Sequence, residues 1–168
     1  ATDAMKVSGV EKVMEVQGWP WPSKFQPLGG VAVIARSGLW ARAGGGFGAM
    51  AARYASALLG AGLESGDRVA LQLEKSPDML AVIAGAIRAG IVFLPLNTAY
   101  TPAEISYFVA DAGARLLLCD GRTETALAPV AAAAGARLAT LNADGSGSFA
   151  EAARAAAPGP VAERAADD

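Results

Sequence analysis

The sequence predicts an α/β fold, a mostly parallel sheet of about four strands flanked by helices. Short runs rich in Val, Ile and Leu alternate with longer segments in which apolar residues recur every three or four positions. Glycines, and prolines preceded by a capping residue, separate these segments. Alternation at this spacing typically gives parallel strands joined by right-handed crossovers, so a parallel sheet is expected.

The first helix is expected over residues 48–63, where one apolar stripe repeats at helical spacing. The stripe consists of Met50, Tyr54, Ala57, Leu58 and Ala61. Gly62 and the turn Ser65-Gly66-Asp67 end this helix. A short strand follows over residues 68–73, in which Gln72 indicates an alternating pattern of apolar and polar positions.

The second helix begins at Ser76-Pro77-Asp78, because Ser76 can cap it, Pro77 sets the first turn and Asp78 suits the positive end of the helix dipole. Gly90 supplies a left-handed residue that ends it. The side chains expected on its buried face are Met79, Leu80, Ile83 and Ile87.

A strand over residues 91–94, bounded by Pro95, leads to a third helix. Its Thr101-Pro102-Ala103-Glu104 start is a capping box with proline at the first helical position. The helix is expected to reach about residue 112, with Ile105, Phe108 and Val109 directed inward. Residues 115–119 form a further buried strand, in which Cys119 is expected to be a small core residue.

A weaker unit completes the alternation. It comprises an alanine-rich helix from about residue 123 to 134, a strand over 137–141, a loop over 142–148 and a short helix over 149–156. The predicted division of the chain is an N-terminal extension (1–45), an α/β subdomain (46–157) and a polar tail (158–168) that should fray.

Residues 1–45 differ in character from the rest and contain all three tryptophans. The Trp19-Pro20-Trp21-Pro22 run cannot lie inside a helix, and only residues 31–34 could form a strand. Two interpretations stay open: a partner-binding arm with exposed tryptophans, or a loosely ordered extension, including one altered by a frame error in the gene. We expect this segment to be dispensable for folding.

The composition limits the function classes. Fourteen basic and sixteen acidic side chains give a net charge of −2, so neither nucleic acid nor an anionic membrane surface is an expected partner. The longest apolar run is about half of what a bilayer requires, which predicts a soluble chain. The single cysteine favours a reducing cytoplasm, and the lack of histidine excludes imidazole-based catalysis and metal sites. No metal-binding residue is predicted.

Four stretches between residues 66 and 120 resemble the adenylate-forming acyl-CoA synthetases, the AMP-binding enzyme family. They are Gly66-Asp67-Arg68-Val69, Arg88-Ala89-Gly90, Leu94-Pro95-Leu96-Asn97 and Tyr100-Thr101-Pro102-Ala103-Glu104. The pattern EKSPDML…PLNTAYTPAEI…CD is most similar to the malonyl-CoA synthetase branch. The resemblance covers residues 47–168 and implies the first subdomain of an N-terminal domain. It implies ATP, Mg and coenzyme A as cofactors of a parent enzyme that ligates malonate or methylmalonate to coenzyme A through an acyl-adenylate.

The resemblance also places the family's phosphate loop just beyond Asp168 and its catalytic lysine in a later domain. This chain is therefore expected to be a fragment that is inactive alone, has no catalytic residue and binds no cofactor tightly. It should self-associate through an exposed sheet edge, or need its missing half in order to stay monomeric.

Two alternatives stay open: an inactive remnant or interaction module of the same fold, and a fragment of an aryl- or fatty-acyl-CoA ligase. The glycine-rich stretches 44–46 and 145–148 are expected to be ordinary loops.

The candidate binding residues follow strand ends, where ligands bind in parallel α/β sheets. They are Asn97, Thr98, Ala99, Tyr100 and Arg122. The resemblance implies that they line a coenzyme A channel. The alternative is that Asn97 and Thr101 only order the turn and cap the helix, and that Arg122 is a surface arginine.

Overall fold

The structure is a computed structural model that describes residues 46–159. The expectations for residues 1–45 and 160–168 lie outside this range. Helices and strands alternate throughout, in the order α4 (Phe47–Gly60), β1 (Arg68–Gln72), α5 (Pro77–Arg88), β2 (Val92–Pro95), α6 (Pro102–Ala112), β3 (Leu116–Cys119), α7 (Glu124–Ala133), β4 (Arg137–Thr140) and α8 (Ser148–Ala155). Each element expected from the sequence within this range is present, with ends that differ by a few residues.

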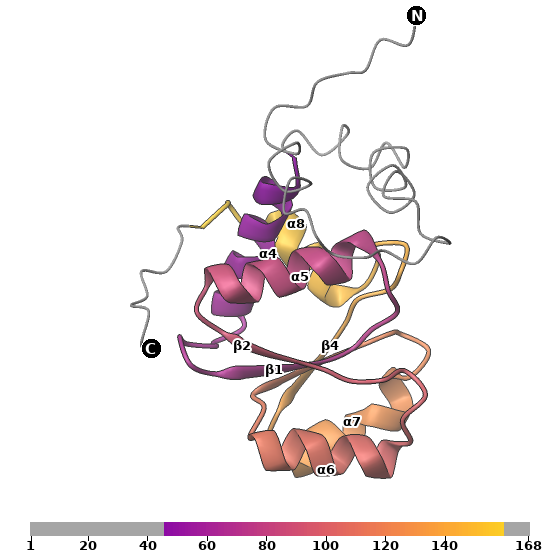
Figure 1. Cartoon of the computed structure of the whole chain (residues 1–168). Coiled ribbons are helices and arrows are strands. Elements are labelled where there is room, and N and C mark those ends of the chain that lie inside the picture. The colour runs from indigo at the N-terminus through magenta and orange to yellow at the C-terminus, as the bar shows by residue number, and fades with distance from the viewer. Residues whose placement is uncertain (1–45, 160–168) are drawn as a thin grey trace, which may run out of the picture. The chain divides into compact units, whose positions relative to one another are not determined.

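The strands form one four-stranded sheet in the order β2-β1-β3-β4, and every neighbouring pair is parallel. Helices α4, α5 and α8 cover one face and α6 and α7 the other (Figure 1). The predicted α/β fold is therefore confirmed. Because all strands run in the same direction, their carboxyl ends meet at one edge of the sheet, where ligands bind in such folds.

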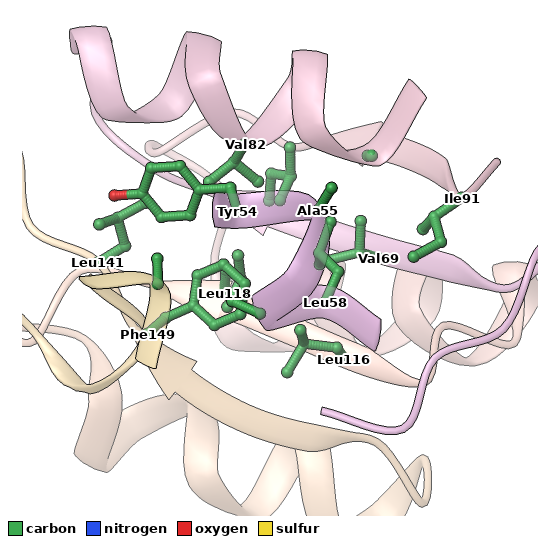
Figure 2. Packing of buried hydrophobic residues seen from close by; sticks show 14 of the residues in the cluster. Tyr54, Ala55, Leu58, Val69, Val82, Ile91, Leu116, Leu118, Leu141 and Phe149 are labelled. Carbon is green, nitrogen blue, oxygen red and sulfur yellow. The ribbon is translucent and has the colours of Figure 1, made fainter. Parts of the chain in front are cut away.

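The larger hydrophobic core lies between the sheet and the layer of α4, α5 and α8 (Figure 2). The rings of Tyr54 from α4 and Phe149 from α8 stack with their centroids 5.8 Å apart. Leu58 and Leu118, in the same cluster, are fully buried. Burial of each leucine side chain contributes about 1.5–3 kcal/mol. This core holds α4 and α8, which are far apart in sequence, on the same face of the sheet.

The contact between α4 and α5 is made by small residues. A Cβ atom added to Gly85 would lie 2.8 Å from the Ala51 carbonyl oxygen and 2.9 Å from the Ala55 nitrogen. The buried face of α5 is accordingly formed by Asp78, Ala81, Val82, Gly85 and Ala86. The sequence-based prediction of this face was wrong for Leu80 and Ile87, which are 48% and 63% exposed. Close backbone approach, and not side-chain size, decides which face of α5 is buried.

Strand β1 also differs from its expected pattern. Gln72 was predicted to alternate with apolar residues, but its side chain is buried with those of its neighbours, and the residue is 3% exposed. β1 lies between β2 and β3 and is covered by helices on both faces. Central strands of parallel sheets are buried on both faces, so a polar residue there must find hydrogen-bond partners inside the protein.

Helix ends follow the chemistry read from the sequence. Ser76 caps α5 by accepting a hydrogen bond from the Met79 nitrogen at 3.1 Å. Thr101 and Glu104 form the predicted capping box of α6. Gly90 has a φ of 70°, in the left-handed region that favours glycine. The cap of α6 also fixes the direction of the chain as it leaves the loop after β2.

Candidate functional site

A polar pocket of about 260 Å³ lies at the carboxyl ends of β2, β1 and β3. It is lined by Gln72, Glu74, Thr98, Asp120, Arg122 and Thr123. A larger hollow of about 360 Å³, between α4, α8 and β4, is lined mainly by alanines, with Ser56 and Ser148 as its only polar side chains among the described residues. The smaller pocket is the better candidate because it combines charged and hydroxyl groups at the ligand-binding edge of a parallel sheet.

Arg122 and Asp120 form a tight charged pair at this pocket. The Arg122 backbone nitrogen and Nε donate to Asp120 Oδ1 at 2.9 and 2.7 Å, and its terminal NH2 donates to Oδ2 at 3.2 Å. The hydrogen bonds from the side chain and backbone of Arg122 lower the pKa of Asp120, and the same carboxylate raises the pKa of Arg122. Both groups are charged at neutral pH, and two-point pairing fixes the guanidinium plane.

Gln72 forms the buried floor of the pocket. Its Nε2 lies 3.5 Å from the Thr98 carbonyl oxygen, and its Oε1 accepts from Thr123 Oγ1 at 3.5 Å, so both contacts are long. Thr123 Oγ1 also lies 3.0 Å from the Asp120 carbonyl oxygen. One amide side chain thus contacts the loop after β2 and the segment after β3.

The structure brings two of the five predicted binding residues together: Thr98 and Arg122 both line the pocket. Asn97 orders the turn, because its Oδ1 accepts from the Ala99 nitrogen at 3.0 Å, and Ala99 is exposed outside the pocket lining. Tyr100 stacks on Phe108 of α6 with the ring centroids 5.3 Å apart. The loop therefore has both a structural part and a part that faces the pocket.

Sequence reasoning did not identify the other pocket residues. Gln72 and Asp120 stand at the carboxyl ends of β1 and β3, and Glu74 and Thr123 follow within a few positions. The strand-end rule led to the loop after β2 and to Arg122 after β3. Applied to the last residue of β1 and to the first residue after β3, it would also have identified Gln72 and Asp120. Glu74 could not be found in this way, because its relevance comes from a contact with Arg122 at 3.6 Å.

The glycine-rich loop at 145–148 uses its polar groups internally. Ser146 donates through its nitrogen and hydroxyl to Asp144 Oδ1, and the Gly145 carbonyl oxygen accepts from Arg154. A Cβ atom on Gly147 would lie 2.5 Å from the Thr140 carbonyl oxygen. This loop is a tight connection between β4 and α8, as expected from the sequence.

Cys119 is fully buried in β3, in agreement with its predicted role as a core residue. Burial raises the pKa of its thiol to about 11. The thiol is therefore protonated at neutral pH and is a poor nucleophile.

Metal-ligating clusters and membrane-spanning helices are both missing from the part of the chain that the structure describes. Residues 46–159 contain no group of three or more His, Cys, Asp or Glu side chains placed to hold a metal ion. None of the helices in this range has the length and apolar character needed to cross a membrane.

The fold is that of the N-terminal domain of adenylate-forming enzymes. A family model described as AMP-binding enzyme matches residues 45–168, and the chain belongs to this family. The crystal structure of apo MatB from Rhodopseudomonas palustris is 44% identical with a TM-score of 0.70, and the match covers 73% of this chain and 24% of MatB.

Two curated relatives show the breadth of the family. Long-chain-fatty-acid–CoA ligase FadD13 from Mycobacterium tuberculosis (strain ATCC 25618 / H37Rv) is 31% identical over 121 residues, which are 71% of this chain and 24% of FadD13. The 3-hydroxybenzoate–CoA/4-hydroxybenzoate–CoA ligase from Thauera aromatica is 35% identical over 68 residues, which are 40% of this chain and 13% of that ligase. The chain thus spans a quarter or less of the length of these relatives.

Proposed function

We propose that residues 46–159 are the part of an ATP-dependent acyl-CoA ligase that forms one wall of its coenzyme A channel. In the complete reaction, the carboxylate would attack the α-phosphorus of ATP, which gives the acyl-adenylate and releases pyrophosphate. The thiol of coenzyme A would then lose its proton and attack the acyl carbon, which gives the thioester and releases AMP. The observation that supports this function is the polar pocket where Thr98 and Arg122 meet. Malonate or methylmalonate is the proposed acid, because the chain is 44% identical to MatB over the matched region.

The pocket fits a phosphate-bearing ligand in its donors. Arg122 has a side chain that is 75% exposed, and its NH1 group has no partner among the described residues. Thr98 and Thr123 line the same pocket. The pocket forms only one wall, however, whereas tight sites enclose about 70–90% of a ligand. We therefore expect this chain to bind coenzyme A only in about the millimolar range.

ATP and Mg²⁺ belong to the same proposal, but residues 46–159 are not their expected site. Adenylation needs several preorganised donors around the phosphates, and losing even one typically costs about 10²–10³ in rate. The glycine-rich loop at 145–148 does not offer them, because its polar groups are paired internally. We expect no ATP–pyrophosphate exchange with malonate by this chain alone.

A chimera tests the proposal. Residues 46–159 would replace the matching segment of MatB, and thioester formation and ATP–pyrophosphate exchange would be measured with malonate. We expect both activities. Arg122→Gln in the chimera should raise the KM for coenzyme A and leave the exchange rate nearly unchanged. Arg115→Gln is the matched control, because Arg115 is an exposed arginine that pairs with Asp67 at the opposite end of β3.

A folded chimera without exchange would favour the inactive remnant. A chimera whose KM for coenzyme A does not respond to Arg122→Gln would exclude Arg122 from the channel. The acid preference measured in this chimera reports on MatB residues. The acid used by the parent enzyme is therefore tested separately, by comparing acids with that enzyme.

A further inference from the structure

The candidate pocket contains one cationic and two anionic side chains, Arg122 with Asp120 and Glu74, and so has a net charge of −1. An anionic ligand that approaches Arg122 is therefore opposed by the surrounding field. The attraction of Arg122 for such a ligand should grow when one of the two pocket carboxylates moves away from the guanidinium.

Asp120 is not the carboxylate that moves away from Arg122 when a ligand binds. The residue is 8% exposed and accepts three N–H groups of Arg122, at 2.7, 2.9 and 3.2 Å. Releasing the arginine would leave a buried carboxylate without those donors, which is costly. Asp120 instead fixes the plane of the Arg122 guanidinium by binding its Nε and NH2 groups. The NH1 group of Arg122 then points away from the carboxylate oxygens of Asp120.

Glu74 is held much more weakly. Its Oε1 lies 3.6 Å from the Arg122 NH2, a distance too long for a hydrogen bond. The Glu74 side chain is 47% exposed, and exposed ion pairs of this kind contribute little to stability. Glu74 can therefore turn toward solvent at small cost when another anion reaches Arg122.

We propose that Glu74 is a built-in competitor that sets the affinity of this pocket for phosphate groups, and that Asp120 is the positioning residue that orients Arg122 toward them. The inference rests on the proposed function only for the identity of the ligand, coenzyme A. The competition itself concerns phosphate groups that reach Arg122, and it should weaken as salt screens the exposed charges.

The test uses the full 168-residue chain and two probes, coenzyme A and inorganic pyrophosphate, with pantetheine as a control that lacks phosphate. Binding is followed by ¹H–¹⁵N spectra at low and at physiological salt. Glu74→Gln should tighten both phosphate probes by about three- to five-fold at low salt and less at high salt. Glu151→Gln, which removes the same charge from an exposed site on α8, should change affinity by less than about two-fold.

Asp120→Asn makes the sharpest comparison, because it also removes one negative charge. It should weaken binding, in the opposite direction to Glu74→Gln, and should speed solvent exchange of the Arg122 Nε–H. In an Arg122→Gln background, Glu74→Gln should have little effect on either probe. A melting curve for each variant separates these effects from loss of the fold.

Three results would overturn the inference. They are equal tightening by Glu74→Gln and Asp120→Asn, an undiminished effect of Glu74→Gln without Arg122, and no binding of either probe by any variant at about ten millimolar. Pyrophosphate binding with the expected pattern, but no response to coenzyme A, would leave the inference standing and contradict the coenzyme A function. Binding of pantetheine alone would contradict both.

Discussion

At the scale of single residues, the buried pair of Tyr54 and Asp78 links α4 to the start of α5. The Tyr54 hydroxyl donates to Asp78 Oδ1 at 2.6 Å, and Asp78 Oδ2 is buried with no hydrogen-bond partner among the described residues. Tyr54→Phe would remove the hydrogen bond to Oδ1 from a buried carboxylate whose Oδ2 already has no hydrogen-bond donor. We expect a loss of about 1–3 kcal/mol in the free energy of unfolding, measured by denaturant titration. Tyr107→Phe, at a position 66% exposed, should cost almost nothing.

The same tyrosine predicts a pH effect. Burial, and then the hydrogen bond to Asp78, raise the pKa of Tyr54 well above its ordinary value. A group whose pKa is raised by folding stabilises the protein fully below its unfolded pKa, about 10, and loses that contribution as the pH rises above it. Between about pH 9 and pH 11, wild type should therefore lose more stability than Tyr54→Phe. If the free energy of unfolding fell equally in both proteins over this pH range, Tyr54 would not be the group that controls stability at alkaline pH.

The partner of Tyr54 was not predictable from sequence. Asp78 was expected to favour the dipole of α5, and it does lie in the first turn of that helix. Its contact with Tyr54 depends on how closely α4 approaches, and this distance is set by residues elsewhere in both helices. The same limit explains Glu74, whose contact with Arg122 joins residues that follow two different strands.

At the scale of elements, the residues that cap and end the helices could be predicted from the sequence. The face of a helix that is buried could not always be predicted. The capping box at Thr101 and the left-handed Gly90 depend on local backbone chemistry, and both predictions are confirmed. The buried face of α5 depends on a close helix contact at Gly85. Helical spacing gives the possible faces of a helix but does not say whether large or small residues meet the neighbouring helix.

Two glycine substitutions test this interpretation of the α4–α5 contact. Gly85→Ala gains helix propensity, about 1 kcal/mol, but its Cβ would press on backbone atoms of Ala51 and Ala55, and overpacking typically costs about 1–3 kcal/mol. We expect net destabilisation. Gly60→Ala in the last turn of α4 meets no atom within 4 Å, so it should be neutral or slightly stabilising. Melting curves of the two variants would contradict the packing argument if both shifted in the same direction.

At the scale of the whole molecule, the order of strands and helices was predictable because each element has its own start and stop signals. The site was predictable only in part. The strand-end rule led to Thr98 and Arg122, whereas Tyr100 belongs to the core beneath α6. Charge competition in the pocket arises from two segments, which follow the neighbouring strands β1 and β3, so it becomes visible only when the sheet is assembled.

The flank of the sheet formed by β2 and α5 predicts how this chain associates. β2 is an edge strand of the described sheet, with Val92 51% exposed, and the outer face of α5 exposes Leu80 and Ile87. An uncovered edge strand beside apolar side chains can pair with a second copy of the same chain. We expect concentration-dependent self-association in sedimentation experiments, and we expect Ile87→Lys with Val92→Lys to shift the chain toward monomer. Tyr107→Lys, an exposed aromatic on α6, is the matched control. A wild-type chain that stays monomeric at high concentration, or association that the double variant does not weaken, would show that this flank is not the contact surface.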